Sequence, residues 1–201
     1  IVVAQLTSDN CALPSNDVYS LAMDYYSTLW IGTAFGVCSY NKYNNTWNVY
    51  NTEKGLPGNM VKSIAVDLSG NVWFGIYTPA TVTKFDGNNF TNYSVPGGVR
   101  VNSLAFDSKN NLWVCSAHGI YKYDYLNWAN WYPPQIAWKD VTCIAIEENG
   151  VKWIGTSKGL TRYNDTTFTT YKIADGLADD NVRTITIEGK NKWIGTINGI
   201  S

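Results

Sequence analysis

The segment at residues 152–164, KWIGTSKGLTRYN, decides the fold, because related segments recur along the whole chain. The other copies read LWIGTAFGVCSYN (29–41), VWFGIYTPATVTKFD (72–86), LWVCSAHGIYKYD (112–124) and KWIGTINGIS (192–201). Their tryptophans are Trp30, Trp73, Trp113, Trp153 and Trp193, separated by 43, 40, 40 and 40 residues. A fixed period of about 40 residues indicates a repeat architecture in which each copy is one structural unit.

The residues on either side of each tryptophan repeat as well. An acidic residue lies five or six positions before it, and the five are Asp24, Asp67, Asp107, Glu147 and Glu188. A glycine follows six positions after it in four copies, as Gly36, Gly119, Gly159 and Gly199. The second copy differs, with Pro79 at that place and two extra residues. We interpret the acids as structural, because Asp beside a turn satisfies backbone amides.

Each unit is expected to form four short strands. The first strand has an alternating pattern, as in VYSLAMD, VKSIAVD and VNSLAFD, which is typical of a half-buried strand. The second strand carries the tryptophan, the third follows the glycine, and the fourth holds two aromatic residues three positions apart. Four strands in about 40 residues are typical of a propeller blade. We expect the recurring tryptophans to pack between blades.

The pattern therefore predicts an all-β, five-bladed β-propeller formed by a single domain at residues 1–201. The repeats run roughly over residues 5–50, 51–93, 94–131, 132–171 and 172–201. The last repeat has no fourth strand, so we expect residues 1–4 to complete that blade and close the ring, with residues 1–5 beside Gly199 to Ser201. A fragment of a larger propeller is the alternative.

The composition excludes several classes of partner. The formal net charge is -1, so no overall field favours nucleic acid or an anionic membrane. No apolar run approaches the roughly 20 residues that span a bilayer, so no membrane insertion is expected. We expect no metal or other cofactor, because the chain has one histidine and no clustered ligands. We interpret the four cysteines as small buried residues, although one or two disulfides remain an alternative. They are Cys11, Cys38, Cys115 and Cys143.

These repeats resemble the two-component regulator propeller family, which occurs in the periplasmic sensor regions of bacterial hybrid histidine kinases. The matching stretches are KGLPGNMVKSIAVDLSGNVWFG, WIGTSKGLTRYN and DGLADDNVRTITIEGKNKWIGTINGI. The resemblance covers essentially the whole chain. It implies a periplasmic or extracellular sensor domain that binds a ligand, often a carbohydrate. The chain has no kinase or DNA-binding region, and sensors of the family usually carry more blades.

A candidate site lies in two classes of loop that a propeller brings to one face. The loops between second and third strands vary at one equivalent slot, while the framework around it repeats. Trp138, in PPQIAWKD, has no aromatic counterpart in the other copies, and it either stacks on a sugar ring or packs on Pro133 and Pro134. The expected ligand-binding residues are Phe35, Tyr77, His118, Trp138, Lys158 and Asn198.

No catalytic residue is assigned from the sequence. His118 is the only conventional general base near neutral pH, and no nucleophile motif accompanies it. Asp17, Asp140 and Asp180 lie at the starts of first strands, where paired carboxylates would suit glycoside hydrolysis. Capping of a repeated turn explains them more simply. The favoured function is a non-catalytic propeller that binds a small molecule, a carbohydrate or a protein partner. A lectin-like protein and, less favoured, a carboxylate glycosidase are the alternatives.

Overall fold

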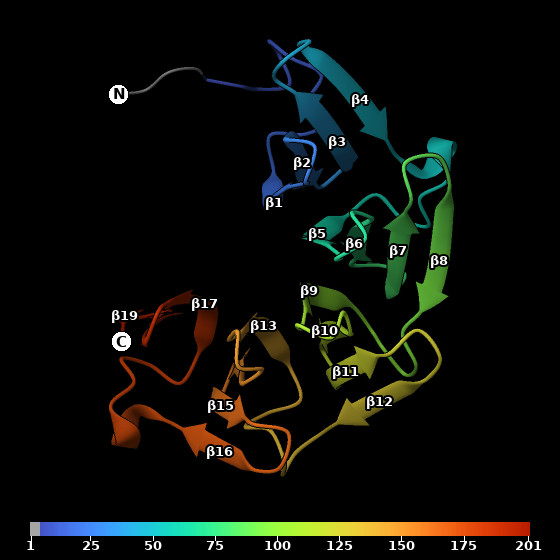
Figure 1. The fold of residues 1–201 in the computed structure, drawn as a ribbon. Helices are drawn as coiled ribbons and strands as arrows, with labels where there is room; N and C mark the ends of the chain where they lie inside the picture. Colours follow the sequence, from blue (N-terminus) through green and yellow to red (C-terminus); the bar gives the residue numbers. More distant parts are fainter. Residues whose placement is uncertain (1–4) are drawn as a thin grey trace. The chain divides into compact units, whose positions relative to one another are not determined.

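The computed structural model describes residues 5–201 and confirms an all-β, five-bladed β-propeller fold (Figure 1). The strands of the first two blades are β1 (Val18–Met23), β2 (Thr28–Thr33), β3 (Gly36–Asn41), β4 (Thr46–Tyr50), β5 (Val61–Val66), β6 (Val72–Ile76), β7 (Thr81–Phe85) and β8 (Phe90–Ser94). Those of the third and fourth are β9 (Val101–Phe106), β10 (Leu112–Ser116), β11 (Gly119–Tyr123), β12 (Trp128–Trp131), β13 (Val141–Ile146), β14 (Lys152–Thr156), β15 (Gly159–Tyr163) and β16 (Phe168–Tyr171). Each of these four blades is a four-stranded antiparallel sheet in chain order.

The fifth blade has three described strands, β17 (Val182–Glu188), β18 (Asn191–Thr196) and β19 (Gly199–Ile200). The fourth strand that the sequence predicts for this blade falls on residues 1–4, which lie outside the described residues. Gln5 is described and belongs to no strand. Ring closure by the N-terminus therefore stays a prediction.

Two short 3-10 helices complete the secondary structure of residues 5–201. They are η1 (Thr52–Lys54) and η2 (Ile173–Asp175), and each follows the fourth strand of a blade. Gly55 and Gly176 end them in the left-handed region, with φ of 102° and 108°. That conformation suits glycine because it has no Cβ.

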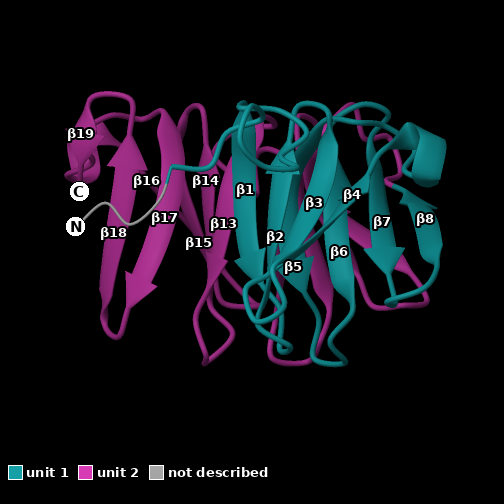
Figure 2. Ribbon diagram, turned by 90° about the horizontal axis from the view of Figure 1, so that it is seen from above, with its two compact units in different colours: residues 1–94 teal, residues 95–201 magenta. Residues whose placement is uncertain are grey.

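The chain forms two compact units, residues 1–94 with blades one and two, and residues 95–201 with blades three to five (Figure 2). Within each unit the strands of a blade lie side by side and alternate in direction. In Figure 2 the β17–β18 turn lies at the lower edge and the β18–β19 turn at the upper edge. The turns of a blade thus divide between two opposite faces.

The first strand of each blade departs from simple alternation. In β9, Val101 and Leu104 are both buried although they are three residues apart. The register with β10 shifts here, because Cys115 lies opposite Ser103 and Ser116 opposite Val101, which leaves Asn102 as an extra residue. The same shift occurs in all five blades. This β-bulge brings the two apolar side chains onto one face.

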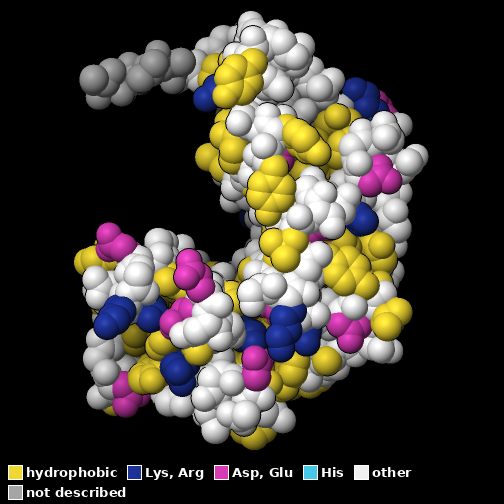
Figure 3. All heavy atoms as spheres, in the orientation of Figure 1, with side chains coloured by type: hydrophobic (Ala, Val, Ile, Leu, Met, Phe, Trp, Pro, Cys, Tyr) yellow, Lys and Arg dark blue, Asp and Glu magenta, His cyan; other side chains and the backbone are white. Residues whose placement is uncertain are grey.

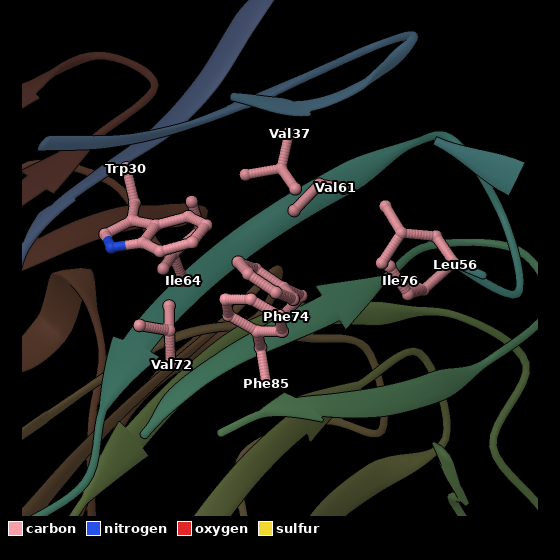
Figure 4. Packing of buried hydrophobic residues seen from close by; sticks show 9 residues of the cluster. All are labelled: Trp30, Val37, Leu56, Val61, Ile64, Val72, Phe74, Ile76 and Phe85. Carbon is pink, nitrogen blue, oxygen red and sulfur yellow. The ribbon is translucent and has the colours of Figure 1, made fainter. Parts of the chain in front are cut away.

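The cores lie between neighbouring blades. In the first unit, Trp30 of blade one packs on Phe74 and Phe85 of blade two, and Figure 4 shows these rings within one cluster that also contains Val61. In the second unit, a comparable cluster joins Trp113 of blade three to residues of blade four. The expected packing of the recurring tryptophans between blades is therefore confirmed for these two positions.

The repeated acids are structural, and they bind the repeated tryptophans directly. The indole N–H of each tryptophan donates to the carboxylate of its own blade, over 2.9, 2.9, 3.0, 2.6 and 2.9 Å in blades one to five. In blades one to three the same carboxylate also accepts backbone N–H groups of the β1–β2-type turn. The acid thus joins the turn to the core, because a buried indole N–H needs an acceptor.

Candidate ligand-binding site

The variable slot of the predicted site stands in a short turn of defined geometry. In blade four, the Thr156 hydroxyl donates to the Gly159 carbonyl over 2.8 Å and accepts the Lys158 N–H over 3.1 Å. Gly159 has a φ of 132°, which disfavours residues with a Cβ. Thr33 makes the same two bonds in blade one. The framework fixes the backbone and leaves the slot side chain free to vary.

The two loop classes named from the sequence do lie together within each unit. In the first unit, the Tyr77 N–H donates to the Met60 carbonyl over 2.9 Å. In the second unit, the Gly119 N–H donates to the Lys139 carbonyl over 2.7 Å, which ties the turn of blade three to the loop leading into blade four. These bonds place each second-to-third turn against a fourth-to-first connection.

The second unit has a cavity of about 340 Å³ among these loops. It is lined by Gly97, His118, Tyr132, Pro133, Trp138 and Lys139. The structure therefore brings together two of the predicted site residues, His118 and Trp138, which are 20 positions apart in sequence. His118 is exposed and Trp138 half-buried. Two aromatic rings, an imidazole and an ammonium group make a lining that suits a small polar ligand with a flat apolar face.

Tyr121 supports one wall of the cavity from behind. Its hydroxyl donates to the His118 carbonyl over 3.4 Å and lies 3.4 Å from the Tyr132 hydroxyl. Burial, followed by this contact with Tyr132, raises the pKa of Tyr121. The phenol therefore stays neutral, and its O–H remains available to donate to the His118 carbonyl. A Cβ on Gly119 would lie 2.7 Å from the Tyr132 ring, so glycine is required for this close approach.

Lys158 contacts the ring of Trp138. Its Nζ lies 3.8 Å from the ring centroid, which is within the range of a cation–π interaction. The contact joins the slot of blade four to the loop that precedes the blade. Lys158 is a predicted site residue that acts here through Trp138, since it does not line the cavity itself.

The other predicted residues have separate surroundings. The Asn198 side-chain amide donates to the Asp179 carboxylate over 2.7 Å, and Asn198 does not line the cavity. Phe35 and Tyr77 belong to the first unit, where Phe35 is 65% exposed and the Tyr77 ring centroid lies 5.6 Å from the Lys62 ammonium. That all six residues surround one channel entrance stays a prediction.

Four lining residues were not among the predicted site residues: Gly97, Tyr132, Pro133 and Lys139. Tyr132 directly follows β12, and its position just after a fourth strand was the only sequence signal that pointed to this face. Pro133 was named as a packing partner of Trp138, and the two residues line the same cavity. The alternatives of packing and binding for Trp138 are therefore compatible.

Two of the three carboxylates considered for hydrolysis, Asp140 and Asp180, are engaged in structural contacts. Both oxygens of Asp140 accept from the Arg100 guanidinium over 3.3 Å. The Asp180 carboxylate accepts the Ile173 N–H over 2.7 Å at the start of η2. Within residues 5–201, no group of three or more His, Cys, Asp or Glu side chains is placed to hold a metal ion.

The four cysteines are free thiols. Cys38 and Cys115 are buried, as expected, whereas Cys11 and Cys143 are half-buried. Burial, followed by the nearby Cys11 thiol, raises the pKa of Cys38 to about 12. Burial also raises the pKa of Cys143 to about 11. Because the thiolate is the nucleophile, neither thiol is activated for nucleophilic chemistry near neutral pH.

The chain is thus a β-propeller in which the sheets of the blades support variable turns, and turns of the second unit line a small cavity. The family model "Two component regulator propeller" matches residues 12–35. The chain thus carries a repeat of the type that the sequence resembled. No curated protein matches the chain as a sequence. Among residues 5–201, no helix has the length and apolarity needed to cross a membrane.

Solved structures share the fold at low sequence identity. The extracellular domain of the hybrid two-component system BT3049 from B. thetaiotaomicron is 20% identical, with a TM-score of 0.85 over 98% of this chain and 28% of that chain. The extracellular domain of BT4673 from the same organism is 22% identical, with a TM-score of 0.77 over 92% of this chain and 26% of that chain. Virginiamycin B lyase from Staphylococcus aureus is 15% identical, with a TM-score of 0.78 over 92% of this chain and 65% of that chain. This chain therefore spans only about a quarter of the two extracellular domains.

Proposed function

We propose that this propeller is an extracytoplasmic binding domain that holds a carbohydrate in the cavity lined by His118, Tyr132 and Trp138, without turning it over. The observation that carries the proposal is the convergence of two aromatic rings with polar groups in one cavity of about 340 Å³. Sugar rings present flat apolar faces that stack on aromatic side chains, and their hydroxyls need nearby donors and acceptors.

The similarity to extracellular domains of hybrid two-component systems supports the sensor role and the extracytoplasmic location. The lining supports binding without catalysis. His118 is the only lining residue with a side-chain base that is effective near neutral pH, and no carboxylate lines the cavity with it. Acid–base hydrolysis of a glycoside needs a pair of carboxyl groups.

A ligand-observed NMR screen of neutral mono- and oligosaccharides tests this proposal. The wild-type protein is compared with a Trp138→Ala, Lys158→Ala double variant, and Trp193→Ala serves as the matched control. Trp193 is 51% exposed in the same unit and does not line the cavity.

We expect saturable binding by the wild type and the control, and its loss in the double variant. Equal binding by all three proteins would place the site elsewhere. If the wild type binds none of the sugars, carbohydrate is the wrong ligand class. A chromogenic glycoside screen complements the test, since measurable turnover would contradict binding without catalysis.

A further inference from the structure

A second cavity lies between blades three and four, on the face that carries the β9–β10 and β15–β16 turns. Its volume is about 330 Å³, and it is lined by Asp107, Ser108, Lys109, Lys122, Asn149, Gly150, Lys152 and Asp165. None of these residues belongs to the cavity around Trp138. Figure 3 views the molecule from this face, and lysine and arginine side chains gather there over the second unit. The two cavities thus differ in both face and chemistry.

The cavity is built around a buried lysine. Lys152 is only 2% exposed, and its ammonium group pairs with the Asp165 carboxylate. The same ammonium lies 4.9 Å from the ring centroid of Trp113 and 5.6 Å from that of Tyr163. The aromatic rings and the carboxylate hold this charge in one position. Lys152 therefore contributes a fixed positive charge to the wall of the cavity.

The negative groups in the lining are already satisfied. The Asp107 carboxylate accepts from the Trp113 indole over 3.0 Å and from the Asn111 amide over 2.9 Å, and also from two backbone N–H groups. Asp165 is paired with Lys152. Three lysines against two carboxylates leave one positive charge in excess in the lining. Lys152 balances Asp165, so Lys109 and Lys122 together face one remaining lining carboxylate, Asp107, and Lys122 also interacts with the exposed Asp124 carboxylate just outside the lining.

We propose that this cavity is an oxyanion site, in which Lys109 and Lys122 hold a sulfate, phosphate or carboxylate group against the charge of Lys152. Ser108 and Asn149 also line the cavity. The Ser108 hydroxyl and the second N–H of the Asn149 amide, whose first N–H donates to Glu147, can donate to the oxyanion. Charge-assisted hydrogen bonds from ammonium groups to oxyanions are among the stronger polar interactions in proteins. The ligand is either a free inorganic anion or the acidic group of a larger molecule.

The test uses inorganic sulfate as the probe. Sodium sulfate is titrated into the ¹⁵N-labelled protein at constant ionic strength, with sodium chloride as the reference salt. We expect saturable shifts of the Lys109, Asn149 and Gly150 amides that chloride does not reproduce. Lys109→Ala, Lys122→Ala is the test variant, in which an exposed and a half-buried ammonium group are removed. Lys42→Ala, Lys54→Ala is a charge-matched control in the first unit, where both side chains are exposed.

The test variant should bind sulfate at least about tenfold more weakly, whereas the control should bind like the wild type. A Lys109→Arg, Lys122→Arg variant keeps the charges and should retain binding. Equal shifts in wild type and test variant, or shifts by chloride of the same size, would overturn the proposal. Sulfated and desulfated forms of one oligosaccharide then distinguish a free inorganic anion from the acidic group of a larger molecule as the ligand. Tighter binding of the sulfated form than of free sulfate indicates a larger ligand, and equal affinity indicates a free anion.

Discussion

At the scale of single residues, the repeated tryptophan and the acid before it form one hydrogen-bonded pair in each blade. The carboxylate accepts the indole N–H and, in blades one to three, holds the turn, so that one side chain joins the surface of the blade to its core. The sequence spacing indicated a role in the turn. It did not indicate the bond to the indole, because a spacing of six residues brings two side chains together only if the turn reverses the chain.

The tryptophans are expected to contribute unequally to stability. Trp113 is 1% exposed and packs between blades, whereas Trp193 is 51% exposed. Trp113→Ala should lower the free energy of unfolding by about 3–5 kcal/mol, the usual cost of emptying a core position, and Trp193→Ala by about 1 kcal/mol or less. Urea unfolding followed by circular dichroism measures both values. Similar losses for the two variants would contradict the assignment of Trp113 to the core.

Asp107 should make stability depend on acid pH. Burial alone would raise its pKa, but hydrogen bonds from Trp113 and Asn111 outweigh burial and lower the pKa below the ordinary value of 3.8. The folded state therefore favours the carboxylate. Its contribution is present above pH 3.8 and is lost as the pH falls through the lower pKa of the folded state.

Asp107→Asn should accordingly lower the free energy of unfolding at pH 7 and make its decline toward pH 3 less steep. Urea unfolding at several pH values between these limits measures the effect. Asp9→Asn, in an exposed turn, is the control and should leave the curve unchanged. A decline as steep as that of the wild type would show that Asp107 does not couple folding to protonation.

At the scale of strands and turns, the bulge in the first strand of blades one, three and four places a side chain against the next blade. In the second unit, the Asn102 amide donates to the Val141 carbonyl and the Thr142 hydroxyl donates to the Val182 carbonyl, both over 2.7 Å. In the first unit, the Lys62 ammonium lies 3.3 Å from the ring centroid of Tyr19. The bulged position therefore links neighbouring blades, and different residue types serve the purpose.

Thr142→Val tests the link between blades four and five. The substitution keeps the shape of the side chain and removes the donor to the Val182 carbonyl, so the free energy of unfolding should fall by about 1 kcal/mol. Thr142→Ser keeps the hydroxyl and should lose less. Thr170→Val, on an exposed position of β16, is the matched control. Thermal and urea unfolding give the values, and a loss no greater than that of the control would rule the link out.

At the scale of the whole molecule, the formal net charge of -1 leaves no strong overall field, so electrostatic effects are local. The two proposed sites should then respond differently to salt. Raising sodium chloride from about 50 to about 500 mM should weaken sulfate binding near Lys109 severalfold, because salt screens partly exposed charges. Binding of a neutral sugar near Trp138 should change by less than about twofold. Isothermal titration calorimetry at both concentrations measures this, and a common response would argue against separate sites.

The sequence alone determined the repeat, the four strands of blades one to four, the turns that need glycine and the positions of the core tryptophans. These features depend on local backbone preferences and on periodicity, and every copy of about 40 residues shows both. His118 and Trp138 were also predicted as site residues, because they interrupt a repeated pattern. Only the tertiary structure decided that Tyr132 and Lys139 share their cavity, that Lys158 covers Trp138, and that Lys152 reaches the ring of Trp113. Such contacts join residues of different blades or loops, and no local pattern records them, since they depend on how successive blades pack.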